Sequence, residues 1–113
     1  FPSSPRREEA EELRKQIHDH LGEKDFLNAK LYYSMRRYEA ALIYFDKVIS
    51  SFPSTVWAQR SQYYRGMIMK ERGNLEEAIA SFEIALRDPE KLPEREEAAE
   101  ALESLQGGGG DGE

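Results

Sequence analysis

The sequence predicts an all-α repeat domain of about five helices, arranged as two helix pairs and a C-terminal capping helix. First, the segments Tyr38–Ile49 and Leu75–Leu86 align at one spacing of 37 residues, which places Phe45 on Phe82. Second, apolar side chains within each segment recur every three or four residues, which is typical of helices. Third, proline and glycine separate the segments. Because a helical repeat cannot bury its apolar face alone, neighbouring repeats supply the core and the remaining curved surface is usually a binding site.

The first pair is expected within residues 8–53. After a non-helical lead-in, Ser4 is placed to cap a helix whose first position is Pro5. Its predicted apolar face consists of Leu13, Ile17, Leu21, Phe26, Ala29 and Tyr33. Gly22 costs about 1 kcal/mol relative to alanine, so the helix should run through it or bend there, and end near Met35. Arg36 and Arg37 make the turn, and a second helix runs from Tyr38 to Phe52, closed by Pro53.

The second pair is expected within residues 56–90. Ser54 or Thr55 caps a helix from about Val56 to Arg72, which stops at Gly73, the usual left-handed residue after a helix. Asn74 opens the next helix, Leu75 to Arg87, and Asp88-Pro89 terminates it.

A capping helix is expected over residues 93–106, beginning at Pro93. The repeat domain therefore covers residues 1–106, and the glycine-rich residues 107–113 are predicted to form a flexible tail.

Small residues should allow close helix crossings within each pair. These are Ala29, Gly66, Ala41 and Ala78, with Tyr32, Phe45, Met69 and Phe82 filling the space beside them. Enlarging a small residue at such a crossing should cost about 1–3 kcal/mol.

Composition narrows the classes of function. Lys and Arg total 16 against 22 Asp and Glu, a net charge of −6, so a nucleic-acid partner is not expected. Cysteine is absent, which excludes disulfides and thiolate metal sites. No apolar run approaches the roughly 20 residues that span a bilayer, and no signal-peptide pattern precedes Phe1. Because the chain also begins without Met, we expect it to be a processed or excised piece.

The order of small, aromatic, alanine, phenylalanine and proline positions resembles the tetratricopeptide repeat, whose usual period is about 34 residues. The matching positions are Gly66, Gly73, Ala78, Phe82 and Ala85. Two departures are present: residues 53–58 carry a longer step between repeats, and Pro89 comes one position early.

That longer step resembles the BamD family of outer-membrane assembly lipoproteins, specifically its C-terminal half. The resemblance covers about residues 13–105 and is carried by the segments 21–29, 32–33, 37–41, 45–49 and 52–55. It implies a non-enzymatic scaffold at the periplasmic face of the bacterial outer membrane. Its C-terminal repeats would bind the periplasmic POTRA region of the barrel-forming subunit BamA, and other subunits of that complex are possible partners. The membrane would be met only through a lipid anchor that this chain lacks.

Partner-binding residues must be exposed and lie outside the repeat core. The predicted set on the convex side is Arg36, Arg37, Tyr44, Lys47 and Trp57. Arg and Tyr are enriched among interface hot spots. The alternatives are that Tyr44 covers a neighbouring helix and that Trp57 is a packing plug between repeats.

The concave groove is the other candidate surface. Its predicted lining is Phe26, Lys30, Tyr33, Arg60, Tyr63, Met67 and Lys70. Aromatic and cationic side chains together suit an extended acidic or aromatic peptide, and this would make the chain a general peptide-binding module. The alternative is that Phe26, Tyr63 and Met67 are buried by neighbouring repeats.

The sequence does not indicate catalysis, a cofactor or a metal site. His18 and His20 lie about 200° apart around a helix, so both cannot face one ion. The acidic runs at residues 8–12 and 94–97 lie early in their helices, where carboxylates favour the positive end of the dipole. They are interpreted as solvated faces.

Overall fold

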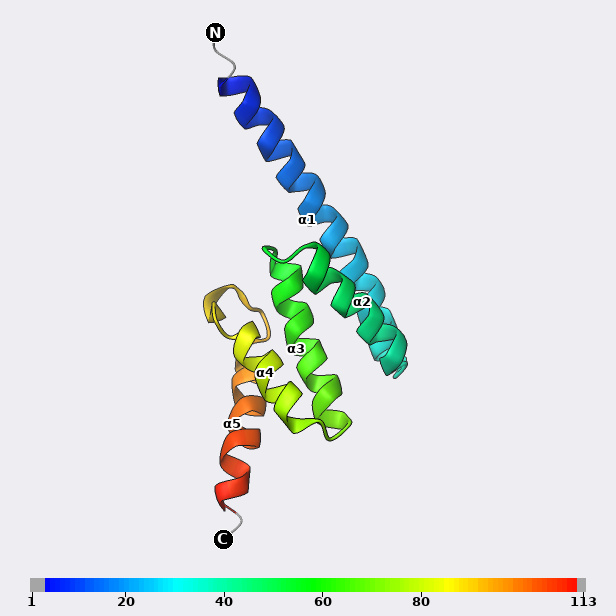
Figure 1. Ribbon diagram of the computed structural model, residues 1–113, viewed down its shortest axis with the longest axis vertical. Helices are drawn as coiled ribbons and strands as arrows, with labels where there is room; N and C mark the ends of the chain where they lie inside the picture. The colour runs from blue at the N-terminus through cyan, green and yellow to red at the C-terminus, as the bar shows by residue number, and fades with distance from the viewer. Residues whose placement is uncertain (1–3, 112–113) are drawn as a thin grey trace.

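A computed structural model describes residues 4–111, and within that range the fold contains helices and no strand, as predicted. The helices are α1 (Ser4–Ser34), α2 (Tyr38–Ser51), α3 (Val56–Glu71), α4 (Leu75–Ala85) and α5 (Arg95–Asp111), with a short 3-10 helix at Pro89–Lys91 (Figure 1). The predicted five-helix architecture is therefore confirmed. The expected lead-in at residues 1–3 and the last two residues lie outside the described range.

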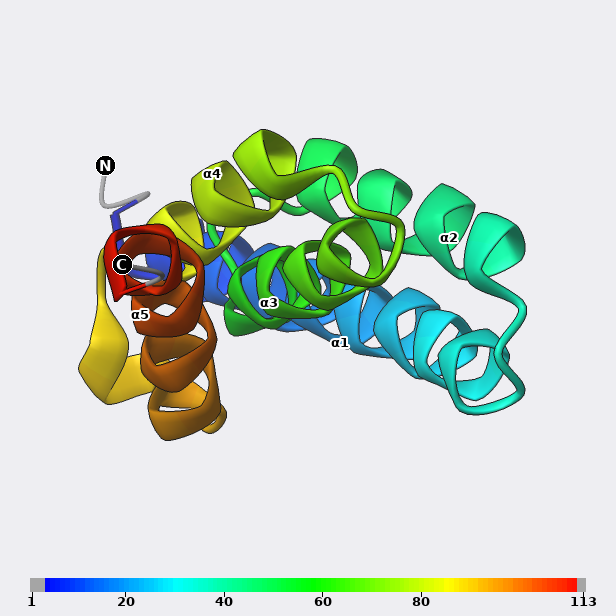
Figure 2. The ribbon, with the colours of Figure 1, turned by 90° about the horizontal axis from the view of Figure 1, so that it is seen from below.

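The helices form two layers. Viewed along the molecule, α2 and α4 lie in one layer, and α1, α3 and α5 lie in the other (Figure 2). Successive helices pack against each other from α1 to α5, and α1 also touches α3. The first half of α1 extends beyond this body, which gives the molecule its 70 Å length (Figure 1).

Residues 37 positions apart in the sequence occupy equivalent places in the two helix pairs. Ala41 and Ala78 are both fully buried, and so are Phe45 and Phe82. At the equivalent crossing positions on α1 and α3, Ala29 is fully buried and Gly66 is buried. A Cβ atom on Gly66 would lie 2.7 Å from Cε1 of Phe82, so this crossing has no room for a side chain. The predicted use of small residues is confirmed.

Local sequence explains most helix ends. Thr55, rather than Ser54, is the N-cap of α3: its side chain accepts a hydrogen bond from the Ala58 amide at 3.2 Å. Gly73 has a φ of 83°, the left-handed conformation predicted after α3. Helix α4 stops at Ala85, two residues before the expected end. Pro89 has no N–H to donate to the Ala85 carbonyl, which accepts a hydrogen bond from Gln59 instead.

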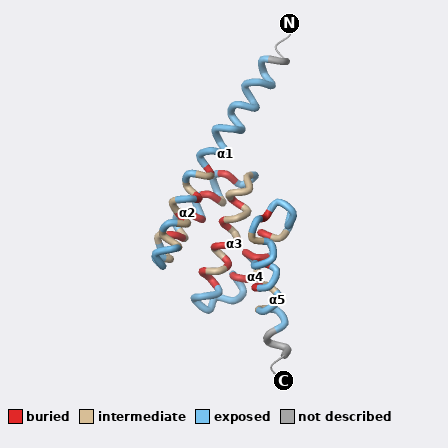
Figure 3. The backbone as a smooth tube through the Cα atoms, turned by 180° about the vertical axis from the view of Figure 1, so that it is seen from behind, coloured by how far each residue is buried: buried red, intermediate tan, exposed pale blue. Residues whose placement is uncertain are grey.

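The predicted apolar face of α1 is wrong over its first half. Leu13, Ile17 and Leu21 are exposed, and α1 is exposed along its whole projecting part (Figure 3). Helix α1 is longer than the helices it packs against. Its outermost aromatic contact joins His18 to Phe52, the residue that follows the end of α2, and no described element lies alongside the residues of α1 before His18.

Gly22 does not break α1. Its position is buried, and a Cβ atom there would lie 3.3 Å from Phe52 and 3.4 Å from Trp57. The glycine therefore allows the connection between α2 and α3 to approach α1 closely.

Helix α5 continues to Asp111, five residues beyond the predicted boundary at 106. A formed helix gains one hydrogen bond for each residue added, so it can extend over glycines that each cost about 1 kcal/mol relative to alanine. The flexibility of residues 107–113 stays a prediction.

Burial changes the ionisation of the core tyrosine Tyr63. Tyr63 is 7% exposed, and burial, reinforced by negative charge at Tyr33, Glu97 and Glu94, raises its pKa to about 12 from an ordinary value of 10.0. Because the pKa is higher in the folded state, Tyr63 contributes stability that is complete below pH 10 and is lost as the pH rises to about 12. Between those pH values we expect the free energy of unfolding of Tyr63→Phe to fall less steeply than that of the unmodified chain in urea titrations. Parallel slopes would contradict this.

Candidate functional site

A hydrogen-bonded cluster joins α1, α3 and the segment before α5 on the side where the groove was expected. Glu94, just before α5, accepts hydrogen bonds from Arg60 Nε at 3.0 Å and Nη2 at 2.6 Å, and from the Tyr64 hydroxyl at 3.1 Å. Lys30 Nζ from α1 donates to the Tyr64 hydroxyl at 3.2 Å. A carboxylate from the chain itself thus occupies the centre of this cationic surface.

Ionisation at this cluster follows from its contacts. Burial alone would lower the pKa of Arg60, but its hydrogen bonds and charge attraction to Glu94 outweigh this and raise it. The pKa of Tyr64 is raised by burial first and then by the charge of Glu94. The cluster therefore holds a neutral tyrosine beside a compensated ion pair.

The other predicted groove residues do not form one exposed surface. Phe26 is 1% exposed and Tyr63 is buried, so both belong to the core and the prediction that they line a groove is wrong. Arg60 covers the ring of Phe26, with its guanidinium carbon 4.8 Å from the ring centroid. Tyr33 and Met67 are half-buried, while Lys70 is exposed near the end of α3.

A second surface lies at the turn between α1 and α2. Tyr44 of α2 stacks on Tyr32 of α1, with ring centroids 5.5 Å apart and planes 12° from parallel. Arg36 and Arg37 follow just after the end of α1, in the turn that leads to α2, and both are exposed. We call Tyr32, Arg36, Arg37 and Tyr44 the turn surface. Within residues 4–111, neither arginine has an acidic partner in an ion pair.

Arg36 has an unusual backbone conformation. Its φ is 62°, in the left-handed region, whereas the equivalent residue of the second repeat is Gly73, with a φ of 83°. A side chain costs roughly 1–2 kcal/mol in this conformation. Arg36 thus retains a charged side chain at a position where the other repeat has none.

The remaining two residues of the predicted convex set lie elsewhere. Lys47 forms an ion pair with Asp25 at 3.3 Å, across the contact of α1 and α2. Trp57 donates from Nε1 to Asp19 at 3.3 Å and packs 5.4 Å from Phe26, between α1 and α3. Trp57 therefore acts as the packing plug between repeats that was the alternative interpretation.

Comparison with known proteins agrees with this architecture. The family model described as "Tetratricopeptide repeat" matches residues 29–55 and 60–89, half of the chain. The chain belongs to the tetratricopeptide-repeat family. Such domains are typically non-enzymatic modules that bind other proteins. No curated protein and no solved structure matches the chain.

The structure of this tetratricopeptide-repeat protein corrects one interpretation of the acidic residues. Glu94 is not part of a solvated face: its side chain is 12% exposed and bridges α5 to α3. Glu94 stands 37 residues after Trp57, and both residues reach back from a helix start to the preceding repeat. This equivalence was present in the repeat spacing and could have indicated the role.

Two further sets of polar contacts, made by Arg65 and Gln59 of α3, were not predicted from the sequence. Arg65 Nη1 donates to Ser81 at 2.7 Å, and its guanidinium pairs with Asp46 and Glu77, which joins α2, α3 and α4. Within the second pair, Gln59 of α3 donates to the carbonyl group of Ala85, the last residue of α4, and to that of Asp88 just beyond it. A pocket of about 490 Å³ opens beside Gln59 and contains none of the predicted site residues.

The two histidines lie on different sides of α1. His18 packs edge-on against Phe52, while His20 lies on an exposed side of α1 near Glu23. The described residues contain no group of His, Asp and Glu that could hold a metal ion. In the same range, no helix combines the length and hydrophobicity needed to cross a membrane.

Proposed function

We propose that the chain is a scaffold of outer-membrane protein assembly whose turn surface holds a POTRA domain of a BamA-type partner. The observation that carries the proposal is Arg36, an exposed cation kept in a left-handed conformation where the equivalent repeat uses Gly73. Unfavourable backbone conformations are often found at sites of function. The partner's identity, and a location at the periplasmic face of the outer membrane, rest on the BamD resemblance of residues 13–105.

The charges favour the turn surface over the groove. Arg60 and Lys30 already contact Glu94 and Tyr64, so an acidic ligand in the groove would have to displace a carboxylate of the chain itself. Arg36 and Arg37 have no such competitor among the described residues. The stacked Tyr32 and Tyr44 add a rigid apolar surface beside them. Arginine with tyrosine is a frequent combination at interface hot spots, and here it suits an acidic partner surface.

The test is calorimetric titration of a purified POTRA domain from the same organism into this chain. We expect 1:1 binding that Arg37→Glu weakens by a factor of ten or more, about 1.4 kcal/mol. Arg36→Gly should also weaken binding, although it relieves backbone strain and should leave the free energy of unfolding unchanged or raise it by up to about 1 kcal/mol. Weaker binding without a lower free energy of unfolding would show that the Arg36 side chain contributes to binding and that unfolding does not cause the loss.

The matched control is Lys70→Glu, an equal reversal of charge at an exposed residue of α3 that is not part of the turn surface. It should bind like the unmodified chain. Loss of binding in Lys70→Glu alone would instead support a peptide-binding groove. If the folded chain does not bind the POTRA domain at all, the proposed partner is wrong.

A further inference from the structure

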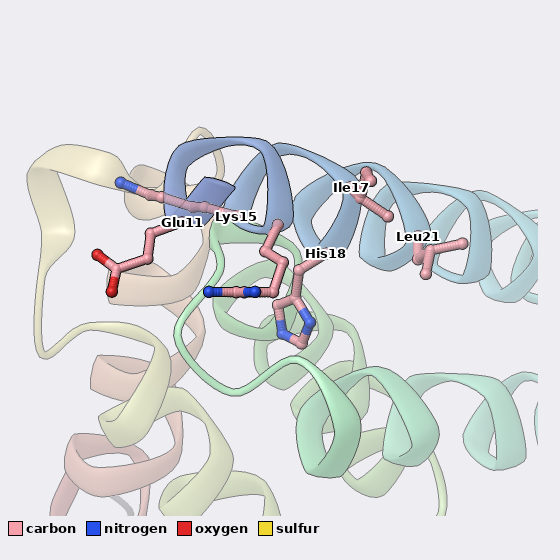
Figure 4. Close-up of a pocket in the computed structure, with 6 residues that line it drawn as sticks. Glu11, Lys15, Ile17, His18 and Leu21 are labelled. Carbon is pink, nitrogen blue, oxygen red and sulfur yellow. The ribbon is translucent and has the colours of Figure 1, made fainter. Parts of the chain in front are cut away.

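A pocket lies beside Gln59, where the two helix pairs meet. Its volume is about 490 Å³, in the size range of ligand-binding sites. Its walls come from the end of α2, the connection to α3, α3 itself, and the end of α4 with the segment that follows. The pocket in Figure 4, by contrast, is lined by α1 alone between Glu11 and Leu21, so no second element encloses it. We call the pocket beside Gln59 the junction pocket.

The more buried lining of the junction pocket is apolar. Ile49 of α2, Val56 of α3 and Ile84 of α4 are half-buried. The charged lining residues are all exposed, and they are Arg87, Asp88 and Lys91. A ligand side chain that enters the pocket therefore meets aliphatic surface inside and charge nearer the solvent. Ligand sites commonly anchor an apolar group in this way and orient it with a few polar contacts.

In the first helix pair an ion pair occupies the equivalent place. Lys47 of α2 and Asp25 of α1 lie 3.3 Å apart. The residues 37 positions later are Ile84 and Gln62, and both line the junction pocket. Neither carries a charge, so they cannot form the ion pair. The surface that Lys47 and Asp25 cover in the first pair is therefore left open to a ligand in the second.

Hydrogen bonds hold the walls of the junction pocket in place. Gln59 Nε2 donates to the Ala85 carbonyl at 2.9 Å and to the Asp88 carbonyl at 2.6 Å. These bonds tie the end of α4 and the segment after it to α3, so the pocket is formed before any ligand arrives. Because both protons of this nitrogen are used, the side-chain oxygen of Gln59 is the part left to accept a hydrogen bond from a ligand.

The charges at the junction pocket favour an acidic ligand. Lys91 pairs with Asp88 at 3.6 Å, but both side chains are exposed, and an ion pair of this kind contributes little. Within residues 6–107, whose side chains the structure describes, Arg87 has no ion pair. The opening thus carries an excess of positive charge on a chain whose net charge is −6. A guanidinium group suits a carboxylate because it can donate two parallel hydrogen bonds to it.

We propose that the junction pocket binds a short acidic segment of a partner protein. One leucine or phenylalanine side chain of that segment enters between Ile49 and Ile84, and an adjacent carboxylate binds Arg87. A backbone N–H of the segment donates to the free oxygen of Gln59. The pocket is concave and small, so it suits a linear segment and not the flat surface of a folded domain. This site shares no residue with the turn surface and does not depend on the function proposed for it.

Titration of the isotope-labelled chain with short peptides, followed by NMR, tests the proposal. The probe is acetyl-Asp-Phe-Asp-amide, which should cause saturable shifts at the backbone amides of Gln62, Ile84 and Arg87, with a dissociation constant below about 1 mM. Acetyl-Asn-Phe-Asn-amide lacks the charge and acetyl-Asp-Ala-Asp-amide lacks the apolar anchor, and each should bind about ten-fold more weakly or worse. Absence of saturable shifts at these amides, or equal affinity for the three peptides, would overturn the proposal.

Substitutions in the chain test the residues that form the site. Arg87→Gln should weaken binding of the probe by about ten-fold or more, and the matched control Arg95→Gln, at an exposed arginine of α5 outside the pocket, should not. Gln62→Asp with Ile84→Lys introduces the ion pair of the first helix pair, so it should abolish binding while circular dichroism and the melting temperature stay unchanged. Full binding by Arg87→Gln, or by a folded Gln62→Asp, Ile84→Lys variant, would contradict the assigned site.

Discussion

Phe45→Ala should lower the free energy of unfolding by about 3–5 kcal/mol, the usual cost of removing a fully buried phenylalanine. Phe45 is inaccessible to solvent and stacks on Tyr64, with ring centroids 5.6 Å apart and planes 6° from parallel. It also lies within 6.0 Å of Phe26 and 6.4 Å of Tyr33, measured between ring centroids. One side chain therefore joins α1, α2 and α3, and its loss leaves a cavity where the two repeats meet.

Urea unfolding followed by circular dichroism measures this loss. The matched control is Ile43→Ala, two residues earlier on α2, because Ile43 is 69% exposed and its truncation should change the free energy of unfolding by no more than about 0.5 kcal/mol. Equal effects of the two substitutions would show that Phe45 does not hold the repeats together.

The fold was predictable because the two helix pairs carry similar residue types at equivalent positions. The spacing of 37 residues identified Ala41 with Ala78 and Phe45 with Phe82, and all four residues are fully buried. Helix ends were predicted where one residue determines the backbone, as Gly73 does after α3. The projecting half of α1 was missed because the spacing of Leu13 and Ile17 shows that they share a face, but not whether another helix covers it.

The candidate site was less predictable, because exposure depends on contacts between distant segments. Phe26 and Tyr63 have the residue types of a binding groove, yet Arg60 covers Phe26 and the core encloses Tyr63. Glu94 had the local pattern of a solvated helix start, and only the stacking of α5 beside α3 brings it to Arg60. The left-handed backbone at Arg36 was also hidden, since arginine does not favour that conformation.

Gly66→Leu should destabilise the fold by about 1–3 kcal/mol, even though leucine is the better helix former. The first added atom, Cβ, would lie 2.7, 2.8 and 3.0 Å from three ring atoms of Phe82, which is fully buried and cannot move into solvent. Since α3 and α4 approach each other at this glycine, the extra volume must separate the two helices of the second pair. The loss is measured as the free energy of unfolding in urea.

The control for Gly66 separates overpacking from the general effect of replacing a helical glycine. Gly107→Ala, in α5, adds a Cβ atom with nothing within 4 Å, so it should be neutral or stabilising by up to about 1 kcal/mol. Gly66→Ala isolates the Cβ contact, and its cost should shrink when Phe82→Leu removes the ring, because residues in contact have non-additive effects. Additive effects of Gly66→Ala and Phe82→Leu would show that the phenylalanine ring is not what requires glycine at this crossing.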